Sequence, residues 1–192
     1  MTGWSFRQKE DYKLKLLGIS GTLIGTKTLS LVQNVVDHAA ALDPELSAEV
    51  LDLKNYAIEF CDGRPFLQYN EDTRRVVEAI LAADCFVIGT PVFQASLTGA
   101  LKNLFDLLPV DAFRNKVIGF VGTGGTYQHF LVIENQLKPI AGYFRAYTAP
   151  DYVYAHRDHF DENNEIADSG VLERIRQLAA QIAGMSRALQ VN

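Results

Sequence analysis

Short apolar segments alternate with amphipathic segments along nearly the whole chain, and this alternation restricts its fold more than any other feature. Five apolar segments are predicted to be strands, at residues 14–19, 48–53, 84–89, 116–121 and, as a broken strand, 147–156. Segments with apolar residues at helical spacing lie between and after them, at residues 29–39, 71–83, 98–108, 126–141 and 171–188. Because a helical segment joins each strand to the next, we expect a parallel sheet covered by helices on both faces.

The strand order expected for this α/β alternation is 2-1-3-4-5, the flavodoxin-like arrangement of five strands. In that order the loops after the first, third and fourth strands meet at one edge of the sheet, where open α/β sheets bind ligands. These loops are rich in Ser, Thr and Gly, and one carries an aromatic residue. We therefore expect a single ligand site at this edge, whereas residues 54–70, which lack periodicity, are expected to form a surface loop.

Length and composition limit the classes of protein and of partner. With 192 residues the chain is expected to form one domain, residues 14–192, preceded by a flexible polar arm at residues 1–13. The net charge of −5, without a cluster of Lys and Arg, argues against nucleic acid and against an anionic membrane as partners. Cys61 and Cys85 are the only cysteines, so no disulfide framework is expected. No signal or membrane segment is visible, which makes the cytoplasm the expected compartment.

The loop after the first strand has the composition of an anion site. Thr22, Thr26, Lys27 and Thr28 stand just before a helix. The first amides of a helix lack partners within the helix and lie at the positive end of its dipole, so a phosphate monoester suits this loop. The alternative is ordinary N-capping by Thr26 or Thr28. The chain has neither GxxxxGK[ST] nor GxGxxG, the phosphate loops of nucleoside triphosphate and dinucleotide sites.

The loop after the third strand favours a planar, hydrogen-bonding heteroaromatic ring such as a flavin. Pro91 has no N–H and fixes its own φ, so the amides that follow can point outward instead of joining a sheet ladder. Phe93 offers a flat apolar surface beside these amides. The alternative is that Pro91 is only a turn residue and Phe93 only a core aromatic.

The rest of the chain gives weaker indications. Gly124 and Gly125 follow the fourth strand, and adjacent glycines either let the backbone approach a ring closely or form a flexible turn. His156 and His159 fall in a polar run that we expect to be a solvated loop, and no metal site is expected. The helix at 98–108 carries more apolar positions than one buried stripe needs, which predicts a dimer through this face.

Three groups of residues together give the chain a resemblance to a known family. They are Ile19-Ser20-Gly21-Thr22 with Thr26 to Thr28, Thr90-Pro91-Val92-Phe93 with Ser96, Gly99, Leu101 and Lys102, and Thr123-Gly124-Gly125 with Leu137-Lys138-Pro139. In this combination, which extends from Leu14 to about Ala188, the chain resembles the NAD(P)H-dependent FMN reductases. It is most similar to the reductase components of two-component FMN-dependent monooxygenases.

The resemblance implies which residues bind FMN. The phosphate would be held by the first loop, through Ser20, Thr22, Thr26, Lys27 and Thr28. The isoalloxazine would lie along the proline-aromatic loop, through Pro91, Val92, Phe93, Gln94 and Ser96, and would be flanked by Thr123, Gly124 and Gly125. No side chain is expected to act as a catalytic acid or base, because the cofactor carries the chemistry.

We therefore expect an FMN-dependent oxidoreductase that takes hydride from NADPH or NADH, forms a homodimer or homotetramer and supplies reduced FMN to a monooxygenase. Two alternatives with the same fold stay open, a quinone or azo reductase with tightly bound FMN and a flavodoxin-type electron carrier. Carriers usually have a more acidic surface and aromatic residues on both faces of the ring. A flavin-free receiver-like domain is disfavoured, because Ser20-Gly21-Thr22 stands where a phosphoacceptor site needs acidic residues.

Overall fold

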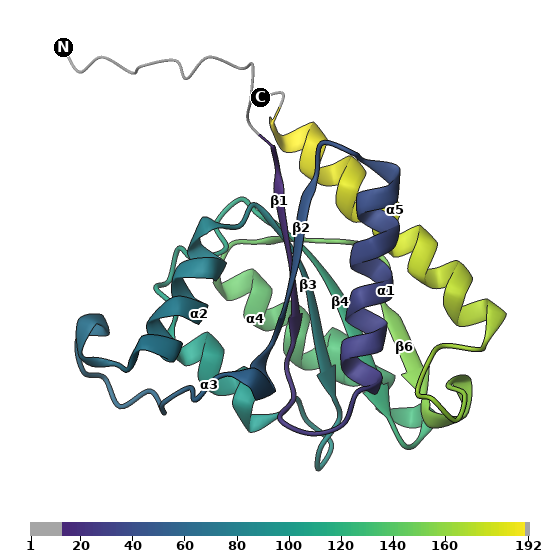
Figure 1. Cartoon of the computed structure of the whole chain (residues 1–192), viewed down its shortest axis with the longest axis horizontal. Coiled ribbons are helices and arrows are strands. Elements are labelled where there is room, and N and C mark those ends of the chain that lie inside the picture. Colours follow the sequence, from purple (N-terminus) through teal and green to yellow (C-terminus); the bar gives the residue numbers. More distant parts are fainter. Residues whose placement is uncertain (1–12, 191–192) are drawn as a thin grey trace.

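A parallel sheet runs through the centre of the computed structural model, which describes residues 13–190 (Figure 1). Its spatial order is β2-β1-β3-β4-β5, with β6 also paired to β4, so the predicted order is confirmed. The strands are β1 (Lys15–Ser20), β2 (Ser47–Asp52), β3 (Cys85–Pro91), β4 (Val117–Gly124), β5 (Tyr147–Thr148) and β6 (Val153–His156). The predicted arm at residues 1–13 lies, apart from Lys13, outside the described residues.

Two short strands share the fifth position of the sheet. β5 pairs with the start of β4 and β6 pairs with its end. Pro150 lies between them, where a residue without an N–H cannot continue the ladder, so the broken strand is confirmed. The expectation of a solvated loop at His156 is wrong, because pairing with β4 continues to Gly124 opposite His156 and buries the imidazole. His159, by contrast, lies in a partly exposed turn.

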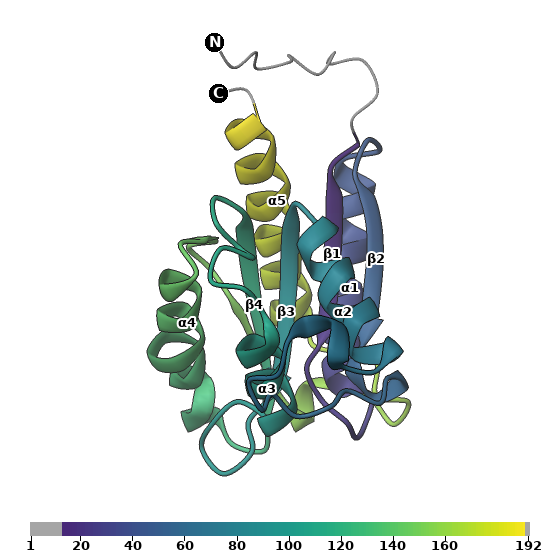
Figure 2. The ribbon, with the colours of Figure 1, turned by 90° about the vertical axis from the view of Figure 1, so that its left-hand side faces the viewer.

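The helices lie on both faces of the sheet, as predicted. One face is covered by α1 (Lys27–Leu42) and α5 (Ser169–Gln190), and the other by α2 (Glu71–Ala82), α3 (Gly99–Leu107) and α4 (Lys138–Tyr143). Figure 2 shows α2 and α3 in front of the strands and α4 to the left of β4, with α1 and α5 behind the sheet. Within residues 13–190, no helix combines the length and the apolar character that crossing a membrane requires.

Glycines in three strands let α1 and α5 approach the sheet closely. A Cβ atom on Gly18 of β1 would lie 2.8 Å from Val32 of α1, and one on Gly89 of β3 would lie 2.5 Å from the same valine. A Cβ atom on Gly119 of β4 would lie 2.4 Å from Ile182 of α5. Because protein interiors are close-packed, side chains at these positions would push the helices away from the sheet.

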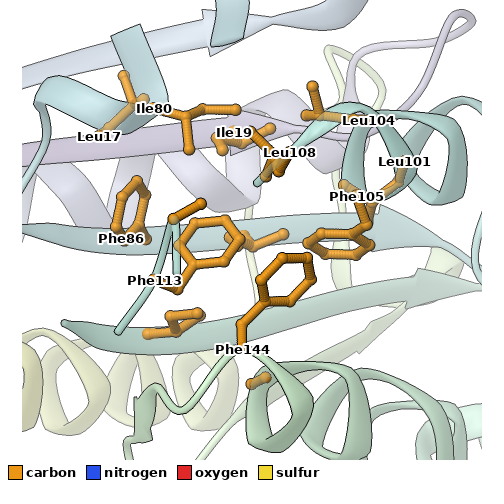
Figure 3. Packing of buried hydrophobic residues seen from close by; sticks show 14 of the residues in the cluster. Leu17, Ile19, Ile80, Phe86, Leu101, Leu104, Phe105, Leu108, Phe113 and Phe144 are labelled. Carbon is orange, nitrogen blue, oxygen red and sulfur yellow. The ribbon is translucent and has the colours of Figure 1, made fainter. Parts of the chain in front are cut away.

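Phenylalanine rings form the centre of the core between the sheet and α2, α3 and α4 (Figure 3). Phe113, in the loop after α3, meets Phe86 of β3 edge-on with ring centroids 4.9 Å apart. It meets Phe144, after α4, at 5.3 Å. Edge-to-face pairs of this kind add about 0.5–1.5 kcal/mol each beyond the area that they bury. The loop after α3 is thereby fixed against the core.

The same packing corrects the expectation of a dimer through the helix at 98–108. Leu101, Leu104 and Phe105 of α3 are buried within the chain, as is Leu108 just after it. The sheet covers one side of this helix and the loop that carries Phe113 covers another, which is why it has more than one apolar stripe. These side chains are therefore core residues and not a surface for a second copy.

The segment after β4 is helical, as predicted at residues 126–141, but it is not a regular α-helix. It begins with a 3₁₀ turn (Tyr127–Phe130) and continues as a helix over residues 131–143, in which a π-helical turn, the π-turn (Ile133–Leu137), precedes α4. Pro139 explains the π-turn, because proline has no N–H for the carbonyl four residues earlier and its ring crowds that carbonyl. β4 itself extends to Gly124, so Gly122, Thr123 and Gly124 belong to a strand and not to the predicted loop.

Candidate functional site

Hydrogen bonds connect the loops after β1, β3 and β4 at the carboxyl edge of the sheet, which is the lower edge in Figure 1. Thr28, at the start of α1, and Thr123, near the end of β4, share a hydrogen bond of 2.9 Å between their Oγ1 atoms. The Val92 amide donates to the Thr123 carbonyl oxygen at 2.8 Å. Thr123 therefore contacts both of the other loops and fixes their positions relative to β4.

A second group of bonds fixes the first loop against β3 and α3. The Gly21 amide donates to the Gly89 carbonyl oxygen at 2.8 Å, and the Thr98 hydroxyl donates to the Gly21 carbonyl oxygen at 2.5 Å. Thr98 also caps α3, because its Oγ1 accepts from the Leu101 amide at 3.1 Å. A Cβ atom on Gly21 would lie 2.7 Å from the Gly89 carbonyl oxygen, so a larger residue could not adopt this position.

A pocket of about 320 Å³ lies between these loops, a size that proteins use for small ligands. It is lined by Ile24, Gly25, Thr26, Lys27, Thr28, Pro91, Phe93, Thr123 and Asn164. Six of these were predicted from the sequence to bind the ligand. The structure thus gathers residues from the loop and helix start after β1, the end of β3 and its hairpin, the end of β4 and the segment before α5 around one space. We call this space the edge pocket.

The start of α1 gives the edge pocket the features of an anion site. The first bond within this helix runs from the Ser30 amide to the Thr26 carbonyl oxygen, so the amides of Lys27, Thr28 and Leu29 have no partner within the helix. The first turn of α1 contains no acidic residue. Thr26 is the N-cap, yet its side chain makes no capping hydrogen bond, so the capping alternative is not supported at this threonine.

Lys27 supplies a positive charge at the same place. Its Nζ lies 5.3 Å from the centroid of the Phe160 ring, a cation–π arrangement that holds the amine at the wall of the pocket. Phe160 and Ile166 form an isolated antiparallel bridge, and the turn between them carries Asn164. The Ser30 hydroxyl donates to the Glu165 carboxylate at 3.0 Å, which fixes this turn against α1.

Thr22 and Ser20 lie behind the pocket instead of lining it. Thr22 is buried and shapes the loop, since its Oγ1 donates to the Ile24 carbonyl oxygen at 3.0 Å and accepts from the Ile24 amide at 3.3 Å. Ser20, the last residue of β1, is also buried, and its hydroxyl has no hydrogen-bond partner among residues 13–190. Their predicted contacts with a phosphate remain predictions.

The loop after β3 is a two-residue hairpin. The amides of Phe93 and Ser96 donate to each other's carbonyl oxygens at 3.0 Å, and Gln94 and Ala95 between them have φ values of 49° and 61°. Two successive positive φ values define a type I′ turn, which usually needs Asn or Gly. Val92 and Ser96 are half-buried in this arrangement, whereas the Gln94 side chain is exposed and does not line the edge pocket.

The loop after β4 is fixed by side chains from β6. The Tyr154 hydroxyl donates to the Thr126 carbonyl oxygen at 2.6 Å, and burial raises the pKa of this phenol. His156 Nε2 lies 2.8 Å from the Gly125 carbonyl oxygen, and its ring stacks on Tyr127 with centroids 4.2 Å apart. Gly125 is exposed, and a Cβ atom on it would meet no other atom within 4 Å.

Gly124 has a different environment from its neighbour. A Cβ atom there would lie 2.0 Å from the Tyr154 hydroxyl oxygen. The expectation that both glycines lie in an open loop is therefore wrong for Gly124, which ends a strand and lies against a buried tyrosine. It lies beside the edge pocket without lining it.

A larger pocket, of about 450 Å³, lies away from this edge, between the loop at residues 54–70, α2 and α3. Most of its lining is apolar, and the guanidinium of Arg64 in its wall is already paired with the Asp62 carboxylate at 2.7 Å. The hydrogen bonds from the Arg64 guanidinium lower the pKa of Asp62 to about 2. The larger pocket therefore lacks the helix start and the open amides that make the edge pocket chemically distinctive.

A family model for NADPH-dependent FMN reductases matches residues 14–160, which include the strands and loops that form the edge pocket. The chain belongs to this family. An NAD(P)H-dependent FAD/FMN reductase from Geobacillus thermodenitrificans is 60% identical over 177 residues, which cover 92% of this chain and 96% of the relative. The resemblance noted from the sequence is confirmed.

Solved structures similar to this FMN reductase family member agree on the fold. An oxidoreductase from Corynebacterium diphtheriae has a TM-score of 0.73 and 25% identity, covering 91% of this chain and 97% of the other. A flavodoxin from the domain Archaea has a TM-score of 0.59 at 9% identity, covering 91% and 99%. The flavodoxin-like arrangement predicted from the alternation of strands and helices is thereby confirmed.

Sequence reasoning missed two residues, one that lines the edge pocket and one that contacts the hairpin beside it. Asn164 lines the edge pocket from the turn before α5, with φ at 62°. Asparagine is among the few residues that adopt positive φ readily, which was the one available signal for a tight turn there. Gln136, in the π-turn, contacts the hairpin after β3. Nothing in the sequence pattern indicates which way a side chain in a π-turn points.

Proposed function

We propose that the protein transfers hydride from NADPH or NADH to FMN that is bound in the edge pocket. One observation carries this proposal: a helix start with three amides free of helical partners and a proline-aromatic hairpin line the same 320 Å³ space. A ligand that fits must have an anionic end and a flat, hydrogen-bonding end, and FMN has both. Membership of the FMN reductase family supports the same assignment.

The residues present fit the two ends of FMN. The start of α1, with Thr26 and Lys27, would hold the phosphate through backbone amides, a hydroxyl group and one positive charge. Pro91 and Phe93 would lie along the ring, and the Phe93 side chain is 43% exposed, which is unusual for a phenylalanine with only a core role. Thr123 would lie between these two ends.

When bound, FMN supplies the hydride-accepting ring, and the dihydronicotinamide of NADPH or NADH supplies the hydride. The chain contributes binding and orientation, since the hairpin and the loop after β4 are both fixed by hydrogen bonds before any ligand arrives. None of the residues that line the edge pocket is an Asp, Glu, His or Cys. Lys27, the titratable residue of this lining, would be at the phosphate end, so the proposed reaction uses no side-chain acid or base at the ring.

Titration of the purified protein with FMN and with riboflavin tests the phosphate end of this assignment. We expect FMN to bind at least tenfold more tightly, because charge-assisted hydrogen bonds contribute about 1.5–3 kcal/mol each and riboflavin lacks the phosphate. Quenching of flavin fluorescence measures both affinities. Equal affinities would show that α1 does not bind the phosphate. Failure of NADPH or NADH to bleach bound FMN under anaerobic conditions would contradict the proposed reaction.

Asn164→Gly tests the residue that sequence reasoning missed. Glycine adopts the φ of 62° without strain, so this change removes the side chain and leaves the turn intact. We expect FMN binding to weaken by about 1 kcal/mol, the usual contribution of a neutral hydrogen bond. Asn163→Ala, at an exposed neighbour that does not line the edge pocket, is the control. Identical FMN affinities for the two variants would exclude Asn164 from the site.

We further propose that this protein is cytoplasmic, that it works as a dimer or tetramer, and that it passes reduced FMN to a monooxygenase. The free thiols of Cys61 and Cys85 support the first of these, because they fit a reducing compartment. Ile24, which lines the edge pocket and is 67% exposed, and its neighbour Leu23, which is 58% exposed, support contact with another subunit there. Sedimentation velocity of the protein and of Leu23→Ser/Ile24→Ser tests the assembly, and a wild-type monomer at micromolar concentration would exclude it.

A further inference from the structure

Gln136 makes two hydrogen bonds that link the π-turn to the hairpin after β3. The Ser96 hydroxyl donates to Gln136 Oε1 at 2.6 Å, and Gln136 Nε2 donates to the Ala95 carbonyl oxygen at 3.2 Å. One side-chain amide thus uses its acceptor and its donor on two adjacent residues of the same turn. The two segments are 40 residues apart in the sequence.

The π-turn places Gln136 in this position. Ile133 and Leu137, at its two ends, are buried in the core and fix the turn against the sheet. The wider turn that Pro139 requires shifts the residues before it relative to a regular helix, and π-turns recur at functional sites for this reason. Gln136 is half-buried beside the hairpin, whereas its neighbour Asn135 is exposed and makes no hydrogen bond to the hairpin.

The hairpin needs such support. Gln94 and Ala95 both have positive φ, a conformation that strains residues with a side chain and persists only where the surroundings over-determine it. Two hydrogen bonds between Phe93 and Ser96 close the turn. Within residues 13–190, the only side chain from another element that hydrogen-bonds to residues 93–96 is Gln136.

We propose that Gln136 is a positioning residue, which acts through the hairpin at residues 93–96 to hold Phe93 and the amides of Gln94 and Ala95 toward the edge pocket. This inference rests on the proposed function in so far as the ligand is FMN. Phe93 is the hairpin residue that lines the edge pocket. The Gln94 and Ala95 amides make no hydrogen bond within residues 13–190, so a turn of fixed orientation presents them as donors.

The test compares Gln136→Ala and Gln136→Glu with the control Asn135→Ala, which lies in the same π-turn. Glutamate keeps an acceptor for the Ser96 hydroxyl and loses the donor to the Ala95 carbonyl oxygen. Hydrogen exchange of the Phe93 and Ser96 amides in the protein without flavin reports the hairpin alone. We expect at least tenfold faster exchange in Gln136→Ala, an intermediate rate in Gln136→Glu and the wild-type rate in Asn135→Ala.

Ligand binding gives the second measurement. We expect Gln136→Ala to bind FMN about fivefold more weakly and to shift the visible absorption bands of the bound flavin, because the ring meets a less ordered wall. The double variant Gln136→Ala/Ser96→Ala should lose less FMN affinity than the sum of the losses in the two single variants, since both substitutions remove the same hydrogen bond. Asn135→Ala should retain the affinity and the spectrum of the wild type.

The outcomes separate this inference from the proposed function. Wild-type exchange at Phe93 and Ser96 in Gln136→Ala would overturn the inference even if the protein reduces FMN. Faster exchange with no effect on FMN affinity or spectrum would also overturn it, because the hairpin would then move without consequence for the site. A wild-type protein that binds no FMN would contradict the proposed function, whereas the exchange measurement would still decide the role of Gln136 in the hairpin.

Discussion

At the scale of single residues, Thr26 has the position of a helix cap without the bond of one. We expect Thr26→Ala to change the free energy of unfolding by less than about 0.5 kcal/mol, because no capping bond is lost, and to weaken FMN binding by about 1.5 kcal/mol. Asn70→Ala is the control, since the Asn70 side chain accepts from the Thr73 amide at the start of α2 and should cost about 1 kcal/mol of stability. Urea denaturation and FMN titration measure both effects. A loss of stability with unchanged FMN affinity would favour the capping alternative.

The two adjacent glycines after β4 predict different results for the same substitution. Alanine at Gly124 would place its Cβ against the Tyr154 hydroxyl group and break the bond to Thr126, so we expect a loss of about 1–3 kcal/mol of stability. Alanine at Gly125 meets no atom, so stability should stay within about 0.5 kcal/mol of the wild type.

Gly125→Val then provides the steric probe of the ligand site. Valine at this exposed position should leave the far-ultraviolet circular dichroism unchanged and slow the reduction of FMN, if the loop lies beside the ring as proposed. Normal kinetics in a folded Gly125→Val variant would remove this loop from the site. Gly124→Val cannot serve the same purpose, because its side chain would clash with Tyr154 and disturb the fold, which would hide any direct effect on the ligand.

At the scale of elements, an ion pair joins the end of α1 to α5. The Arg187 guanidinium donates through Nε and Nη2 to the buried Asp43 carboxylate, and these hydrogen bonds hold the pKa of Asp43 below its ordinary value of 3.8. A lowered carboxyl pKa contributes stability that is complete above pH 3.8 and is lost as the pH falls through the lower folded-state value.

Arg187→Ala should therefore lower the denaturation midpoint at pH 7, and its difference from the wild type should disappear as the pH falls below the folded-state pKa of Asp43. Lys102→Ala, which removes an exposed pair with Asp106 within α3, is the control and should cost about 0.5 kcal/mol or less. A difference for Arg187→Ala that stays constant from pH 7 into strong acid would show that packing, and not the ion pair, is responsible.

At the scale of the whole molecule, the two cysteines differ in burial and can therefore be used to test how the protein opens. Cys61 is exposed, whereas Cys85 lies in the central strand β3, where burial raises its pKa to about 11. Because the thiolate is the reactive form, we expect one thiol per chain to react with Ellman's reagent at pH 8 in the native protein and the second only after global unfolding. Cys61→Ser should abolish the fast phase. Two equally fast thiols would show that β3 opens locally.

Much of the architecture was predictable because it depends on patterns that repeat along the chain. The alternation of strands and helices determined the parallel order, and that order alone brings the loops with Thr28, Pro91 and Thr123 to the same edge. Individual hydroxyl groups were less predictable. The sequence cannot show that Thr22 bonds within its own loop while Thr26 faces the pocket, since both are threonines before one helix.

The errors came from contacts between segments that are distant in the sequence. His156 lies in a locally polar run, and only its pairing opposite Gly124 shows that it belongs to the sheet. The additional apolar residues of α3 indicated a surface for a partner. In the structure, Phe113 of the same chain packs against that surface. Pairing across the sheet and packing of a returning loop leave no local signal, which is why His156 and the helix at 98–108 were misinterpreted.

Gly89 links the packing of β3 to the shape of the edge pocket from beneath it. A methyl group there would press on Val32 and lie 3.1 Å from Thr28 Cγ2, and so would lift the helix start that frames the edge pocket. Random mutagenesis confined to the residues that face the ligand would never sample this position. We therefore expect Gly89→Ala, a substitution outside the lining of the edge pocket, to weaken FMN binding together with the stability of the fold.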